Sequence, residues 1–178
     1  GKSISDILKL NLEKNSFKVT VAYDGEEAVS KAINENPDLK WRVVMMHHDL
    51  YGGSIESREG ENVLLRLILS YIFDEFGIDL VLTGHSHHYS ISHVLYNGEI
   101  AEELSNGETV TNAQGTVYMV SASVGRPRDD ENTYSDRVAI GMDEFTDRLY
   151  NIIDFSETAI TVTTYERGSS QEFASFTL

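Results

Sequence analysis

The sequence predicts an α/β fold, a layered α/β sheet whose carboxyl-terminal part is largely antiparallel. Two short apolar runs, 41–46 and 78–82, are typical of buried strands, and histidines follow shortly after both. Between them, residues 62–76 have the apolar spacing of a helix that packs against a sheet. After residue 93, turn signals divide the chain into short strands. A chain of 178 residues can bury a core of this kind.

The first 38 residues predict a helix, a strand and a second helix. Residues 3–14 place four aliphatic side chains on one helical face. Residues 17–22 alternate like a strand, and the capping-box pattern at 24–27 begins a second helix that stops before the Asn36-Pro37 pair. We therefore expect an αβα segment over residues 1–38.

Residues typical of turns and helix ends predict the remaining elements along residues 39–178. Gly77 is placed to end the helix of residues 62–76, and Asn97-Gly98 predicts a tight hairpin turn. Further strands are expected at 115–123, 149–155, 159–165 and 172–178. The last of these predict an antiparallel carboxyl-terminal sheet.

Five of the six histidines follow the two apolar runs. His47 and His48 come after the first run, and His85, His87 and His88 come after the second, in the loop that Gly84 begins. If the two strands are parallel neighbours, their carboxyl ends lie at one edge of the sheet. Imidazole is a common ligand of zinc, copper and iron, so the pattern predicts one shared metal site at that edge.

Three stretches carry a family resemblance: 43–51, 82–90 and 115–121. On these, residues 39–178 resemble the carboxyl-terminal half of a calcineurin-like metallophosphoesterase of the purple acid phosphatase branch. The resemblance implies one half of that family's sandwich fold. It also implies a phosphoesterase in which a metal-bound hydroxide attacks a phosphate ester. His47 and His85 would bind one divalent metal (Zn, Mn or Fe), and His87 would bind a second.

The resemblance is incomplete. The family's Asp-x-His, Gly-Asp-x-x-Asp and Gly-Asn-His motifs are absent from the sequence. Ile91 stands where family members often carry an arginine, and His48 and His88 match no ligand position. We therefore expect weakly bound metal and leave the catalytic residues unassigned. The alternative is a catalytically inactive chimeric or engineered α/β protein, or an interaction domain, with vestigial histidines.

The roles of one acidic residue and one arginine pair stay open. Asp49 is either an extra oxygen ligand or a residue that caps its own loop. The pair Arg126 and Arg128, in the loop 125–137, either holds a substrate oxygen or belongs to an ordinary surface loop.

Residues 1–38 have a resemblance of their own. The order of elements and the local sequence around Asp24-Gly25 resemble the first helix, second strand and second helix of a bacterial response-regulator receiver domain. The alternative is a generic αβα segment. All six lysines precede Trp41 and all eight arginines follow it. The net charge is −1 over residues 1–40 and −14 over the rest. This composition shift predicts a seam between residues 1–38 and 39–178, as in a chimera, although a fragment of a natural enzyme also fits.

The acidic composition limits the partners. With a net charge of −15 and a pI near 4.6, the chain is not expected to bind nucleic acid, because phosphate contacts need clustered Lys and Arg. No apolar run reaches the length of a membrane span, so no membrane contact is expected. A homodimer and the cellular compartment are left open.

Overall fold

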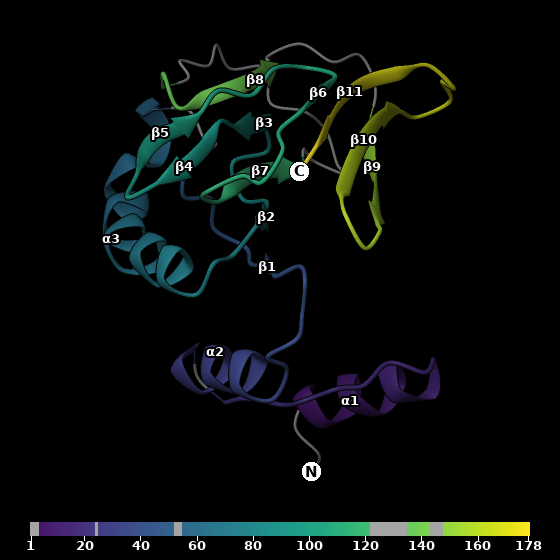
Figure 1. Ribbon diagram of the computed structural model, residues 1–178. Coiled ribbons are helices and arrows are strands. Elements are labelled where there is room, and N and C mark those ends of the chain that lie inside the picture. The colour runs from purple at the N-terminus through teal and green to yellow at the C-terminus, as the bar shows by residue number, and fades with distance from the viewer. Residues whose placement is uncertain (1–3, 24, 52–54, 122–134, 143–147) are drawn as a thin grey trace. The chain divides into compact units, whose positions relative to one another are not determined.

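The computed structural model describes residues 4–23, 25–51, 55–121, 135–142 and 148–178 (Figure 1). The chain divides into two compact units, Gly1–Lys40 and Trp41–Leu178. In the part of the chain that the structure describes, no helix is long and apolar enough to cross a membrane.

The first unit contains two helices, α1 (Ile4–Lys14) and α2 (Gly25–Asn34), as the sequence predicts. The strand predicted at 17–22 is wrong, because that segment has no regular structure. A strand needs a neighbour that accepts its backbone hydrogen bonds, and no described strand pairs with this one. Instead the Lys31 ammonium donates to the Val21 carbonyl oxygen at 3.0 Å, so a side chain of α2 holds the segment.

A five-stranded sheet forms the centre of the second unit, in the order β1-β2-β7-β3-β8. β1, β2 and β7 are mutually parallel, whereas β3 is antiparallel to both of its neighbours. The bounds are β1 (Val43–Met45), β2 (Leu80–Thr83), β7 (Val117–Ser121), β3 (Tyr89–Ser92) and β8 (Val138–Met142). The two predicted histidine-terminated strands are thus adjacent and parallel.

Helix α3 (Ile55–Glu75) covers one face of this sheet (Figure 1). Its Phe73 packs in a cluster with apolar side chains of the strands and of the loop after β1. The helix ends in a Schellman motif, in which the Ile78 amide donates to the Phe73 carbonyl at 2.9 Å and the Gly77 amide donates to Asp74 at 3.2 Å. Gly77 has a φ of +58°, which confirms its predicted role as the glycine after the helix.

A second sheet packs on the other face, in the order β6-β11-β10-β9. Its strands are β6 (Glu108–Thr109), β11 (Glu172–Thr177), β10 (Ile160–Glu166) and β9 (Leu149–Phe155). β9, β10 and β11 are antiparallel, as predicted. The main core lies between the two sheets and contains buried residues of both, including Tyr89, Val117, Ile160 and Phe176. The layered α/β fold predicted from the sequence is confirmed.

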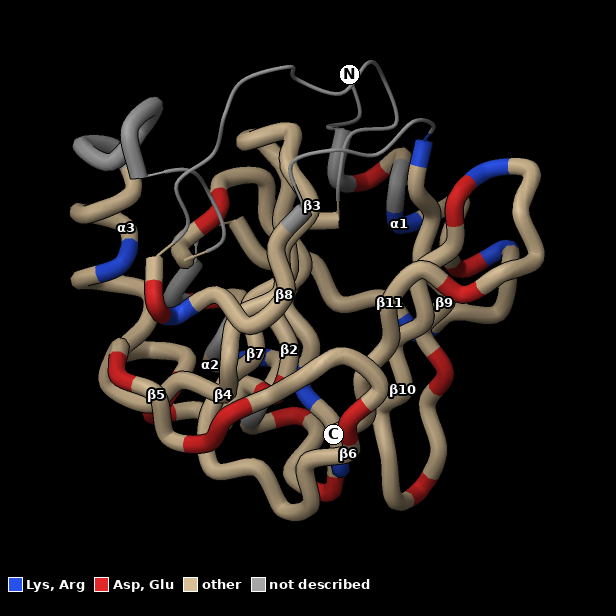
Figure 2. Tube along the Cα trace, turned by 90° about the horizontal axis from the view of Figure 1, so that it is seen from above, with Lys and Arg blue, Asp and Glu red and all other residues tan. Residues whose placement is uncertain are grey.

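A hairpin, β4 (Val94–Tyr96) and β5 (Glu99–Glu102), completes the unit. Asn97 and Gly98 have φ values of +52° and +73°, as their predicted two-residue turn requires. Figure 2 shows acidic residues spread along this hairpin and along the β9–β11 sheet rather than gathered in one patch.

Candidate metal centre

The pairing of β1 with β2 brings two of the predicted histidines together. The register aligns Met45 with Leu82, and backbone hydrogen bonds continue past the strand ends. The Met46 amide donates to Leu82 at 3.0 Å, and the Gly84 amide donates to the His47 carbonyl at 3.1 Å. Each histidine follows its strand by two residues, so both lie at the carboxyl edge of the sheet.

The imidazoles of His47 and His85 face each other. Nε2 of His47 lies 2.9 Å from Nδ1 of His85, and the ring planes are inclined by 79°. A contact this short between two ring nitrogens is a hydrogen bond through one proton. The pair could therefore supply two nitrogen ligands to one divalent ion once the donor imidazole carries its proton on its other ring nitrogen.

The loop after β2 holds its histidines in an uncommon backbone conformation. His85 and His87 have φ values of +66° and +61°, in the left-handed region. The Ser86 amide donates to the Gly84 carbonyl at 2.8 Å, which closes a three-residue turn centred on His85. Gly84 begins the loop, but the left-handed residues are the two histidines that follow it. Strain of this kind persists where the surrounding structure imposes it, and it is common at functional sites.

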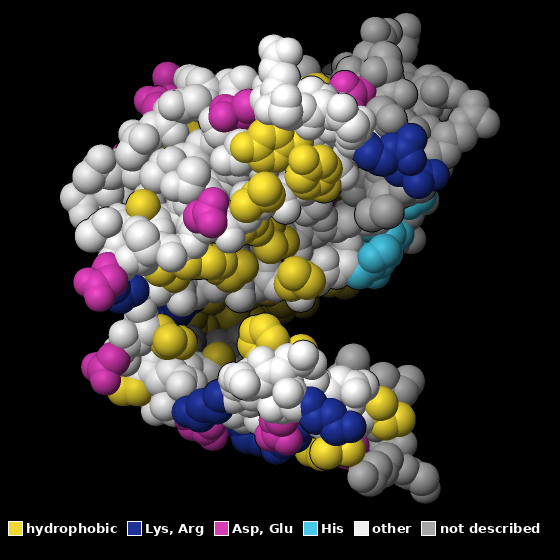
Figure 3. All heavy atoms as spheres, turned by 90° about the vertical axis from the view of Figure 1, so that its right-hand side faces the viewer, with side chains coloured by type: hydrophobic (Ala, Val, Ile, Leu, Met, Phe, Trp, Pro, Cys, Tyr) yellow, Lys and Arg dark blue, Asp and Glu magenta, His cyan; other side chains and the backbone are white. Residues whose placement is uncertain are grey.

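His48 lies closer to the pair than the sequence predicts. Its ring centroid is 4.5 Å from that of His85 and 5.1 Å from that of His47. No sequence signal indicates this contact, because it joins the ends of two strands. His87, the residue expected to bind a second ion, is exposed, and His88 is buried. Figure 3 shows exposed histidine side chains on one flank of the second unit, beside basic side chains.

Within the described ranges, no three His, Cys, Asp or Glu side chains lie close enough together to hold a metal ion. The residues present thus fit part of a coordination shell. His47 and His85 supply two nitrogens, and any further ligands must come from elsewhere.

Asp49 anchors the loop that carries His47 and His48. It is 1 % exposed, and the Asn62 amide nitrogen donates to its Oδ1 at 2.7 Å. This contact joins the loop to α3, which favours the loop-holding role over that of an extra ligand.

Two other expectations concern substrate contacts. Ile91 is fully buried in β3 among core side chains, so its position offers no polar group to a substrate. Arg126 and Arg128 lie outside the described residues.

Comparison with known proteins identifies the family. A model of the calcineurin-like phosphoesterases matches residues 1–89, half of the chain. The chain belongs to the calcineurin-like phosphoesterase family. The match confirms the family expected for the second unit. It also includes residues 1–38, whose receiver-like origin stays a prediction.

Individual proteins are similar to this calcineurin-like phosphoesterase chain over part of their length. Two Mycobacterium tuberculosis proteins, the uncharacterized proteins MT2654 (strain CDC 1551) and Rv2577 (strain H37Rv), are each 27% identical over 95 residues. The match covers 49% of this chain and 18% of each relative. The chain thus spans about a fifth of the length of these curated relatives.

A solved structure shows the same fold. A purple acid phosphatase, PPD1 from yellow lupin (Lupinus luteus) seeds, superposes with a TM-score of 0.61 at 15% identity. The superposition covers 88% of this chain and 28% of the phosphatase. The calcineurin-like phosphoesterases generally bind divalent metals, which agrees with the paired histidines at the sheet edge.

Proposed function

We propose that this protein carries part of the divalent-metal site of a phosphoesterase. His47 and His85 would hold one ion, His87 would contribute to a second, and the substrate would be a phosphate ester. The observation that carries the proposal is the 2.9 Å approach of the two ring nitrogens at the end of paired parallel strands. Family membership supports the reaction class.

The chain's own residues would prepare the site in three ways. The donor of the His47–His85 hydrogen bond would move its proton to its other ring nitrogen on binding, so that both facing nitrogens present lone pairs. The left-handed turn at His85 fixes the direction of its ring, and the Asp49–Asn62 contact fixes the loop that carries His47. A divalent ion held there (Zn, Mn or Fe) supplies the Lewis acidity and positive charge that phosphate-ester hydrolysis needs.

One observation favours the alternative, an inactive protein with vestigial histidines. Two adjacent nitrogens are an incomplete shell, and the described residues add no third ligand. Under this second candidate the protein binds metal weakly and turns over no substrate. The receiver-like origin of residues 1–38, and with it a chimeric chain, belongs to the same candidate. The separate compact unit at residues 1–40 and the lysine–arginine partition support it.

Calorimetric titration of the metal-free chain with Zn²⁺ and Mn²⁺, run beside p-nitrophenyl phosphate hydrolysis, tests the proposal. We expect His85→Ala to weaken binding of the first ion about tenfold or more, because one of two ligands is lost. His87→Ala should spare that ion. His93→Gln is the matched control, since His93 Nδ1 accepts a hydrogen bond from the Leu104 amide, away from the paired histidines.

The outcomes separate the two candidates. Metal binding with turnover that His85→Ala abolishes supports the enzyme. Metal binding without turnover supports the vestigial site. Equal metal affinities in wild type and His85→Ala would show that His85 is not a metal ligand, which contradicts both candidates.

A further inference from the structure

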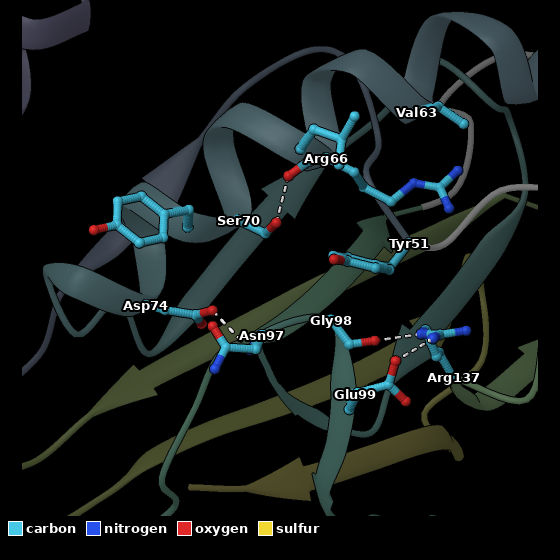
Figure 4. Close-up of a pocket in the computed structure, with 11 residues that line it drawn as sticks. Tyr51, Val63, Arg66, Ser70, Asp74, Asn97, Gly98, Glu99 and Arg137 are labelled. Carbon is cyan, nitrogen blue, oxygen red and sulfur yellow. Dashed lines mark hydrogen bonds and ion pairs between the residues drawn. The ribbon is translucent and has the colours of Figure 1, made fainter.

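A cleft of about 410 Å³ separates α3 from the tip of the β4–β5 hairpin (Figure 4). Leu67, Tyr71 and Asp74 line it from α3, and Asn97 lines it from the hairpin turn. Tyr51 lies between these walls in the close-up. The cleft thus combines aromatic and aliphatic surface with a few polar groups, which is typical of small-molecule sites.

The hairpin side of the cleft is held in place by the groups that line it. The Asn97 amide donates to Asp74 Oδ2 at 2.8 Å, which joins the turn to α3. The Arg137 guanidinium donates to the Gly98 carbonyl and pairs with Glu99 at 3.0 Å. These contacts cross from element to element, so the cleft is preformed.

The charges of the cleft are unequally matched. Arg137 is paired with Glu99, and the Arg66 guanidinium lies 5.5 Å from the centre of the Tyr51 ring. Asp74, in contrast, has no cationic side chain within ion-pair distance among the described residues, and its hydrogen bond from Asn97 occupies one oxygen. Burial raises the pKa of Asp74, and the Asn97 hydrogen bond partly offsets that effect. At the end of the cleft where Asp74 lies, the charge without an ion-pair partner is therefore negative.

We propose that the cleft binds a small organic cation with an apolar body. Its ammonium group would pair with the second oxygen of Asp74. The apolar body would lie against Tyr71, Leu67 and Tyr51, where an aromatic face also attracts the positive charge. In Figure 4 the two guanidinium groups lie away from Asp74, so they do not compete for this end of the cleft.

An anionic ligand fits less well. At the Asp74 end it would meet the unmatched carboxylate, and to reach Arg137 it would have to displace Glu99. Arg66 also lies far from the proposed ammonium position, because it is eight residues from Asp74, or about 12 Å along α3.

The test uses the full chain with metal removed by EDTA, so that its result is independent of the metal site. Phenethylammonium is titrated by calorimetry at physiological ionic strength, with 2-phenylethanol as the neutral probe of the same shape. We expect the cation to bind and the alcohol to bind at least tenfold more weakly. Asp74→Asn keeps an acceptor for the Asn97 amide and should remove this preference.

Glu75→Gln is the matched control, because it removes one negative charge from the adjacent exposed residue of α3. It should leave the affinity for phenethylammonium unchanged, which separates a built site from general attraction to an acidic protein. Tyr71→Ala should weaken both probes, and the cation more than the alcohol, because only the cation is attracted by the aromatic face. The proposal is overturned if neither probe binds, if Asp74→Asn binds the cation as tightly as wild type, or if phenylacetate binds more tightly than phenethylammonium.

Discussion

Single residues at the sheet edge combine ligand chemistry with backbone strain. In His85 and His87 a side chain with a metal-binding nitrogen sits on a backbone that glycine would adopt more easily. His85 also has contacts with two neighbouring rings, whereas His87 is exposed. His87 is therefore the position at which the strain can be measured with little loss of packing.

His87→Gly should raise the free energy of unfolding by about 0.5–1 kcal/mol, because relief of left-handed strain exceeds the added entropy of the unfolded chain. His87→Ala is the control, since alanine keeps the strained backbone and should give no gain. Urea unfolding of the metal-free chain measures both. A loss of stability in His87→Gly would show that the imidazole has a structural role.

A second single-residue effect concerns pH. The Asp79 carboxylate accepts a hydrogen bond from the Arg42 amide at 2.7 Å, at the start of the β1–β2 pair. Burial raises the pKa of Asp79 above its ordinary value of 3.8, and the Arg42 hydrogen bond only partly offsets this. The folded state therefore binds the proton more tightly than the unfolded state does.

Because of this difference, Asp79 makes the free energy of unfolding fall as the pH rises. The contribution of Asp79 to stability is greatest below pH 3.8 and falls as the pH rises through the window between 3.8 and the raised pKa. Asp79→Asn should remove this fall, so wild type should lose stability relative to the variant across the window. Urea unfolding from acid to neutral pH measures the difference, with Asp154→Asn as the control for loss of one charge. A constant difference would contradict the prediction.

At the scale of elements, the contact between the hairpin and β7 depends on a glycine. Gly115 has a φ of +154°, and a Cβ there would lie 2.4 Å from the Leu95 carbonyl oxygen. Leu95 and Thr116 form a two-way backbone bridge directly beside it. The hairpin can lie this close to the sheet only because residue 115 has no side chain.

Gly115→Ala should destabilise the protein by about 3 kcal/mol or more, because the clash is with backbone that cannot rotate away. Gly107→Ala is the matched control. Its φ is +78°, but nothing lies within 4 Å of the added methyl, so only backbone strain of about 1 kcal/mol is expected. Thermal unfolding compares the two. Equal losses would mean that the hairpin moves freely from β7.

For the whole molecule, the two units differ in how much they bury. None of the described side chains of residues 4–40 is buried, and Ile7, Leu10 and Phe17 are between 43% and 61% exposed. The helices α1 and α2 have 11 and 10 residues, a length at which isolated helices are marginal. In contrast, β2 and β7 are central strands of a covered sheet.

Amide hydrogen exchange should therefore be about a hundredfold or more faster in α1 and α2 than in β2 and β7. Mass spectrometry of peptides from the intact chain measures this directly. Equal protection would show that residues 1–40 unfold only with the rest of the protein.

The sequence predicted the elements whose signals are local. The apolar spacing around Phe73, the Asn97-Gly98 turn and the histidines after two strands were read correctly, because each depends on neighbours along the chain. β3 was missed because Ser90 and Ser92 are polar yet fully buried. Alternation at 17–22 suggested a strand, but a strand also needs a partner. The contact between the His48 and His85 rings depends on the tertiary structure, and no sequence pattern indicates it.

The position of β1 has a consequence for handling the protein. Among the described strands it pairs only with β2, so its other edge has no strand partner in the part of the chain that the structure describes, and its last residue, Met45, is 81% exposed. Repulsion between chains of net charge −15 opposes pairing of this edge with another chain at low ionic strength. Added salt shortens the range of that repulsion to about 8 Å at 0.15 M and less above it. Salt should therefore promote self-association of this chain. In complexes held together by opposite charges, salt has the reverse effect and weakens binding.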